Sequence, residues 1–101
     1  IVMNIVTFCD IEDGLIDGKH TVEHFHSGAS GDADIALIDI NTIFDFEENK
    51  GVACKDKYVS LAIIDDEGDY DAFKNFGIDA WIKREDILDI NGIINLIEKR
   101  A

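Results

Sequence analysis

An aspartate at the end of an apolar run is the first residue whose type and position suggest chemistry. Residues Ile35–Ile38 lie between Asp34 and Asp39 and show no alternation of polar and apolar positions. A strand that is apolar on both faces is typical of the centre of a parallel sheet covered by helices. Such a strand should end at Asp39, because an unpaired carboxylate is costly inside the core. Ligands of open α/β sheets bind beyond the carboxyl ends of the strands, so Asp39 is a candidate functional residue.

A second group of acids follows the first predicted strand, which covers residues 2–9 and is rich in β-branched and aromatic side chains. Asp10, Glu12 and Asp13 come directly after this strand. Divalent cations prefer carboxylate oxygens, so Asp10 and Asp13 together with Asp39 form a candidate metal site. Two simpler interpretations stay open: Asp10 and Asp13 can be turn residues, and Asp39 can cap the helix that follows it.

The elements that would position these acids are predicted from the spacing of apolar residues and from capping residues. We expect further strands over residues 21–26, 34–39, 58–64 and 79–83. We expect helices over residues 41–50, 69–76 and 90–100. In the first of these helices, Ile43, Phe44 and Phe46 are predicted to face inward. Gly51 and Gly77 suit the C-terminal ends of the first two helices.

The first half of the chain leaves little room for crossover helices. Neighbouring parallel strands need a connection of about a dozen residues or more, usually a helix, whereas residues 10–20 and 27–33 are short and rich in turn signals. Either these crossovers are reduced to loops, or the first two strands form a hairpin, or residues are missing from the chain. We therefore expect a single domain over residues 1–101 with a three-layer α/β fold. Its sheet is mostly parallel and five-stranded, and the helices after strands one and two are reduced or absent.

The net charge limits the classes of partner that the protein can bind, and the cysteine content indicates its cellular compartment. The net charge of −13 argues against nucleic acids and anionic membranes as partners, since both require a basic surface, but it permits cations and basic proteins. Cys9 and Cys54 lie far apart in apolar segments, which favours two reduced thiols and a cytoplasmic protein. No apolar run approaches the ~20 residues of a membrane-spanning helix. No nucleophile–base pair is visible, so we do not expect an independent hydrolase.

Three stretches of the chain carry a resemblance to a known family. They are Ala36–Asn41, Tyr58–Ile64 and Asp71–Lys83. The first resembles the third strand of the receiver domain of two-component response regulators, which ends in the phospho-accepting aspartate. The second resembles the fourth strand of that domain. The third is similar to its fourth helix, followed by the glycine, the aromatic residue and the lysine that closes the fifth strand.

The resemblance implies a flavodoxin-like receiver fold and a role in two-component signalling. Asp39 would accept a phosphoryl group from a histidine kinase, and Lys83 would contact the phosphoryl oxygens. Asp10, with Asp13 and Asp39, would hold Mg²⁺, because phosphoryl transfer depends on positioning and charge neutralisation. The domain would then be no enzyme, beyond accepting a phosphoryl group on its own aspartate. It would act by protein–protein contact with the kinase, with another signalling protein or with a second copy.

The chain also departs from the pattern of that family. Cys9 occupies the position of the first of two adjacent acids, and Asp65 that of the serine or threonine that binds the phosphoryl group. The glycine-to-lysine spacing is one residue short, so a gapless comparison places Arg84 at the lysine position. These departures predict a degenerate receiver. Two alternatives to phosphotransfer follow: a pseudo-receiver that only binds proteins, with an exposed apolar patch near Trp81 and the last helix, or a small acidic domain that binds divalent cations.

Overall fold

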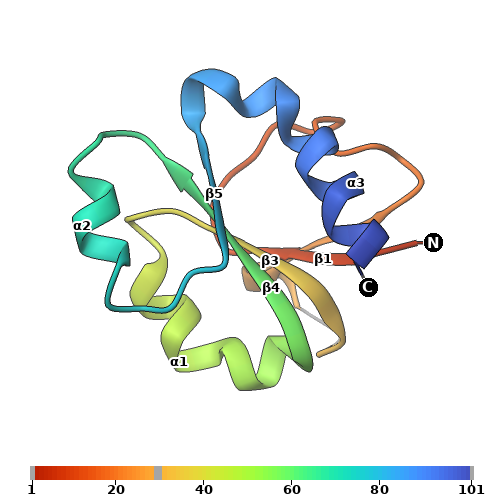
Figure 1. Ribbon diagram of the computed structural model, residues 1–101. Helices are drawn as coiled ribbons and strands as arrows, with labels where there is room; N and C mark the ends of the chain where they lie inside the picture. Colours follow the sequence, from red (N-terminus) through yellow and green to blue (C-terminus); the bar gives the residue numbers. More distant parts are fainter. Residues whose placement is uncertain (1, 29–30, 101) are drawn as a thin grey trace.

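Five parallel strands form a single sheet in the computed structural model, which describes residues 2–28 and 31–100 (Figure 1). The order of the strands across the sheet is β2-β1-β3-β4-β5. This all-parallel order is that of a flavodoxin-like fold, as we predicted from the sequence. The strands are β1 Asn4–Thr7, β2 Thr21–His24, β3 Ala33–Ile38, β4 Cys54–Ile64 and β5 Ala80–Lys83.

Helices cover both faces of the sheet. Helices α1 Ile43–Ala53 and α2 Asp69–Phe73 lie on one face, and α3 Ile90–Arg100 lies on the other (Figure 1). Two short 3₁₀ helices, η1 Phe25–Ser27 and η2 Arg84–Asp89, lie in the connections. These layers confirm the predicted three-layer α/β architecture. Within the part of the chain that the structure describes, no helix is long and apolar enough to cross a bilayer.

The two central strands, β3 and β4, are buried on both faces. Alternate residues of a strand point to opposite faces, so each strand contributes to two separate hydrophobic cores. Ala36 and Ile38 belong to the core under α1 and α2, whereas Ile35 and Leu37 belong to the core under α3. All four side chains are completely buried. This double burial explains why the sequence of β3 is an unbroken apolar run.

The crossover from β1 to β2 is a loop, which was one of the three predicted alternatives. The two strands run parallel, so they do not form a hairpin. The loop packs on the sheet where a helix would otherwise lie: Ile16 is buried in the core under α3. Asn91 of α3 holds this loop, because its side-chain amide donates to the Leu15 carbonyl (3.0 Å) and its side-chain oxygen accepts from the Asp17 N–H (2.8 Å). Between β2 and β3, the only helical turn among the described residues is η1.

The prediction that Phe44 faces inward is wrong. Its side chain is 71% exposed, and its ring makes an edge-on contact with the ring of Phe76. Ile43 and Phe46 are both buried. They are three positions apart and therefore share one face of α1, whereas Phe44 is two positions from Phe46 and lies on the other side. The same helix thus has apolar residues on two faces, only one of which enters the core.

Several elements begin or end away from their predicted limits. Helix α1 was expected to end at Lys50 with Gly51 closing it, but it continues to Ala53, and β4 begins at once with Cys54. Ala53 and Cys54 are both buried, so tertiary packing outweighs the low helix propensity of a glycine. Helix α2 is shorter than predicted, whereas Gly77 after it adopts a positive φ of 65°, as suits a residue that follows a helix. Strand β1 is shorter than predicted at both ends, and β2 ends two residues early.

The two phenylalanines of α1 provide a paired test of the core. Phe46 is 1% exposed, and its ring packs edge-on against Phe8 (5.6 Å between centroids) and Tyr58 (6.0 Å). We expect Phe46→Ala to lower the free energy of unfolding by about 3–5 kcal/mol, through lost burial and the cavity left behind. Phe44→Ala should lower it by less than about 1 kcal/mol. Urea denaturation measures both values, and equal losses would contradict this assignment of the core.

Candidate functional site

Asp39 lies at the switch point of the sheet. From β1 the chain passes to β2 on one side and then returns to β3 on the other side of β1. In open α/β sheets, ligands bind outside the carboxyl ends of the strands at this point. Asp39 directly follows β3 there and is only 7% exposed. The structure therefore places this predicted residue at the expected edge of the sheet, with its side chain turned largely inward.

The Asp39 carboxylate holds the turn that leads into α1. Its Oδ1 accepts hydrogen bonds from the Asn41 backbone N–H (3.1 Å) and from the Thr42 hydroxyl (2.9 Å). The Thr42 Oγ1 in turn lies 3.0 Å from the Asp39 backbone nitrogen, which donates to it. Aspartate commonly stabilises turns through such local hydrogen bonds. These contacts favour the interpretation of Asp39 as the residue that organises the start of α1.

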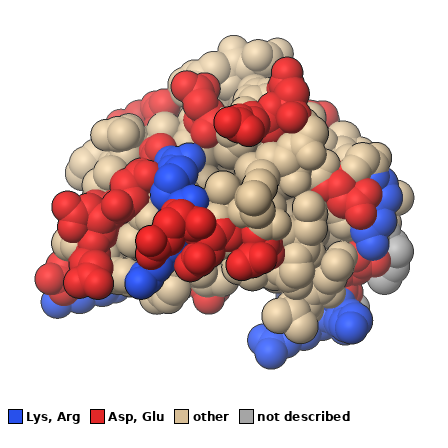
Figure 2. Space-filling model, turned by 90° about the horizontal axis from the view of Figure 1, so that it is seen from above, with Lys and Arg blue, Asp and Glu red and all other residues tan. Residues whose placement is uncertain are grey.

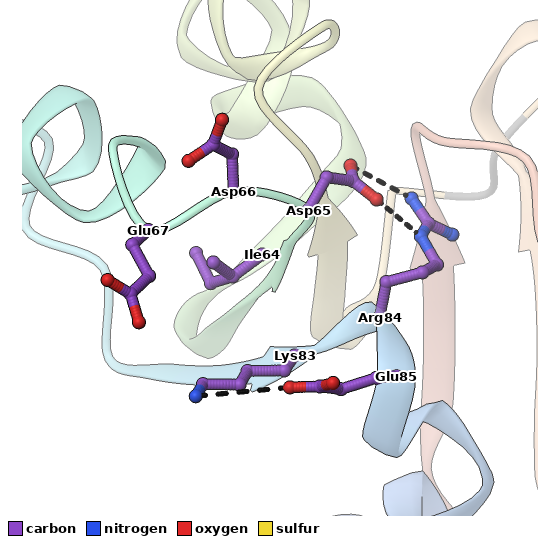
Figure 3. A pocket seen from close by; sticks show the side chains of 7 residues that line it. All are labelled: Ile64, Asp65, Asp66, Glu67, Lys83, Arg84 and Glu85. Atoms are coloured by element: carbon purple, nitrogen blue, oxygen red, sulfur yellow. Dashed lines mark hydrogen bonds and ion pairs between the residues drawn. The ribbon is translucent and has the colours of Figure 1, made fainter.

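The guanidinium group of Arg84 joins Asp39 to Asp65. Arg84 forms a two-point ion pair with Asp65, with Nε 2.8 Å from Oδ1 and Nη2 3.3 Å from Oδ2 (Figure 3). The same Nη2 lies 3.7 Å from Oδ2 of Asp39. The hydrogen bond from Arg84 lowers the pKa of Asp65, and the bond to Asp65 raises the pKa of Arg84. One cation thus partly neutralises the carboxylates that follow the neighbouring strands β3 and β4.

Lys83 points away from this cluster. It is the last residue of β5, whereas Arg84 begins η2, and Figure 3 shows their side chains extending in opposite directions. The Lys83 Nζ lies 4.0 Å from Oε1 of Glu85. The structure therefore brings Arg84, rather than Lys83, to Asp39. The sequence contained a signal for this arrangement. The glycine-to-lysine spacing is one residue shorter than in receiver domains, so a gapless comparison with that family places Arg84 at the lysine position.

The acids proposed as metal ligands do not gather around one point. Asp10 and Asp13 are exposed on the loop after β1. Among the residues that the structure describes, no group of three or more His, Cys, Asp or Glu side chains is arranged to hold a metal ion. Oδ1 of Asp39 is hydrogen-bonded to Thr42, and the positive guanidinium of Arg84 faces its Oδ2. The three acids therefore do not fit a magnesium ion in this arrangement.

Cys9 is buried after β1, where the family resemblance would place an acid. Burial is the main cause that raises the pKa of its thiol to about 11; the negative charge of Asp39 adds to this, while a hydrogen bond with Thr7 and the charge of Arg84 oppose it. The Thr7 hydroxyl also donates to the Cys9 carbonyl (2.7 Å). At neutral pH the thiol is therefore protonated, and a protonated, buried thiol is neither a good metal ligand nor a good nucleophile.

A hollow of about 420 Å³ lies beside the Arg84–Asp65 pair, lined by residues 64–67 and 83–85 (Figure 3). Four of its lining side chains are acidic: Asp65, Asp66, Glu67 and Glu85. Two are basic: Lys83 and Arg84. Acidic side chains also predominate on the face of the molecule seen from above in Figure 2. This negatively charged environment disfavours the approach of an anion such as a phosphoryl donor.

Taken together, the contacts around Asp39 are those of a structural charge cluster. The carboxylate is nearly buried, hydrogen-bonded and ion-paired, so it is poorly placed to attack an electrophile. Comparison with known proteins gave no significant match to any protein-family model, curated protein or solved structure. The chemistry of the site is therefore argued from its geometry.

Removing the guanidinium should raise the pKa of Asp65. In the folded protein this pKa lies below its ordinary value of 3.8, so the stabilising contribution is fully present above pH ~4 and is lost as the pH falls through the folded pKa. We expect Arg84→Gln to lower the free energy of unfolding at pH 7 by about 1 kcal/mol, since the pair is partly exposed to solvent. The difference from the wild type should shrink below pH ~4.

Carbon-detected NMR titration measures the pKa of Asp65, and urea denaturation at several pH values measures the stability. Lys83→Gln is the matched control, because Lys83 is the neighbouring residue and contacts Glu85 instead. It should leave the pKa of Asp65 unchanged. A stability difference between Arg84→Gln and the wild type that stays constant down to pH 3 would contradict the assignment.

Proposed function

We propose that this domain is a receiver-like signalling module that works through protein–protein contacts without phosphorylation of Asp39. The flavodoxin-like strand order and the place of Asp39 at the end of β3 support the relation to receivers. Because many functions share this fold, the proposal rests on the side chains around Asp39 rather than on the fold alone.

The observation that carries the proposal is the position of Arg84 between Asp39 and Asp65. Phosphorylation would place a dianionic group beside Asp65, which is itself negative and already holds Arg84 at 2.8 Å. Oδ2 of Asp39 is the oxygen left for a phosphoryl group, because Oδ1 accepts from Thr42, and the guanidinium group of Arg84 already faces Oδ2. The guanidinium group thus supplies beside Asp39 the positive charge that a metal ion would supply in a phosphorylated receiver.

Exposed apolar side chains provide a contact surface for a partner. Trp81 of β5, Leu88 of η2 and Leu96 of α3 are 42%, 83% and 59% exposed. Trp81 packs its ring against Tyr70 of α2, on the other face of the sheet from α3. Leu88 and Leu96, which belong to η2 and to the helix that follows it, are therefore the apolar residues that we assign to the contact surface. The partner is another signalling protein with a basic surface, which the net charge of −13 would attract, or a second copy of the domain. The two buried thiols, Cys9 and Cys54, belong to different cores and agree with a cytoplasmic location.

The competing function is phosphotransfer to Asp39 with Mg²⁺, and one NMR experiment separates the two. Beryllofluoride with Mg²⁺ mimics a phosphoryl group on an aspartate. We expect the amide resonances around Asp39, Asp65 and Arg84 to stay unshifted when both are added, because Arg84 and the hydrogen bonds of Asp39 leave no site for them. Shifts that spread from Asp39 in the wild type and disappear in Asp39→Asn would instead establish a phosphoacceptor and overturn the proposal.

Partner contact is tested by photo-crosslinking in cells. A photoreactive amino acid at position 88 or 96 should capture the same protein in the wild type and in Asp39→Asn, because the contact does not depend on phosphorylation. Position 48 is the control, since Glu48 is exposed on α1 and therefore lies on the other face of the sheet from α3. Loss of the crosslink in Asp39→Asn, or equal capture from position 48, would contradict the proposed mode of action.

A further inference from the structure

A second and larger hollow lies at the opposite end of the sheet from Asp39. Its volume is about 760 Å³, which falls in the range of small-molecule sites. It is lined by residues near the starts of β1, β3 and β5, by the middle of β4 and by the last turns of α3. Its apolar wall consists of Met3, Val59, Ala80 and Ile97. The hollow therefore offers an apolar surface formed by several elements, well separated from the charge cluster around Arg84.

Two basic side chains without an ion-pair partner lie at this hollow. Throughout residues 2–28 and 31–100, all lysines and arginines form an ion pair with a carboxylate except Lys57, Lys99 and Arg100. Lys57 of β4 and Arg100 of α3 both line the hollow. Two unpaired cations from separate elements therefore lie at one hollow of a chain whose net charge is −13, where they can attract an anion.

The acids of the hollow are largely occupied by other groups. Both oxygens of Asp34 are engaged, since Oδ2 accepts from the Asn4 N–H (2.9 Å) and Oδ1 contacts the Lys55 Nζ (2.9 Å). Oδ2 of Asp79 accepts from the backbone N–H (2.9 Å) and the hydroxyl (3.0 Å) of Ser60. These contacts hold the acids at the strands. Lys57 and Arg100 are then the groups available for a ligand.

We propose that this hollow binds a small organic carboxylate with an apolar body. The apolar part would lie against Met3, Val59, Ala80 and Ile97, and the carboxylate would meet Lys57 and Arg100 at the rim. An arginine fork matches a carboxylate in geometry, and a lysine adds a second charge. Charge complementarity thus selects an anion, and the apolar wall selects one with a hydrocarbon portion. This site goes beyond the proposed signalling role and does not depend on it.

Octanoate and 1-octanol form a matched pair of probes, because they share a hydrocarbon chain and differ in charge. In amide NMR titrations of the full chain, octanoate should cause saturable shifts at Met3, Val59, Ala80 and Ile97. Octanol should bind the same residues with an affinity at least about tenfold lower, since it lacks the charge-assisted hydrogen bonds. Equal affinities for the two probes, or octanoate shifts centred elsewhere, would overturn the proposal.

Variants of the two cations complete the test. The double variant Lys57→Gln/Arg100→Gln should bind octanoate at least about tenfold more weakly while its affinity for octanol is unchanged. Lys99→Gln is the control, because Lys99 is also unpaired and adjoins Arg100 but does not line the hollow. It should bind octanoate as the wild type does. All three substituted residues are exposed, so the fold should be retained, and unchanged amide spectra away from the hollow verify this. Equal losses in the control and the double variant would contradict a specific site.

Discussion

The burial of β3 and β4 on both faces is the constraint on which the rest of the structure depends. Their central residues enter the cores on either side of the sheet, so neither strand carries a charge in its buried part. Charged groups are therefore confined to the two ends of these strands. At the carboxyl ends lie Asp39, Asp65 and Arg84, and at the amino ends lie Asp34 and Asp79, each of which accepts from a backbone N–H of a neighbouring strand.

The shared guanidinium group contacts two carboxylates that the sheet brings to the same end of its strands. Because β3 and β4 are neighbours, the carboxylates that follow them come close together at one edge. Arg84 follows β5, the next strand, and supplies the positive charge from within the chain. This internal pairing is the reason why we propose a function that needs neither a metal ion nor a phosphoryl group.

The short crossovers of the first half show how a flavodoxin-like sheet is covered with few helices. On one face, the loop after β1 buries Ile16 and is tied to Asn91 of α3. On the other face, Phe25 of η1 stacks on Phe8, with 4.5 Å between the ring centroids. His20 at the end of the loop accepts a hydrogen bond from the Met3 N–H (3.0 Å) and so fixes the loop to the start of β1. Single side chains thus provide the cover that whole helices would otherwise give.

The amino-acid sequence by itself determined the elements whose signals are local. The unbroken run Ile35–Ile38 required a strand buried on both faces that ends at Asp39, and periodic isoleucines required the last helix. The tertiary structure alone decided that α1 continues past Gly51 and that Arg84, rather than Lys83, reaches Asp39. Periodicity reports which face of one element is apolar, whereas the Arg84 contacts depend on how elements far apart in the chain are turned toward one another. Such contacts are set by packing: the glycine-to-lysine spacing offered Arg84 as an alternative to Lys83, but it could not decide between them.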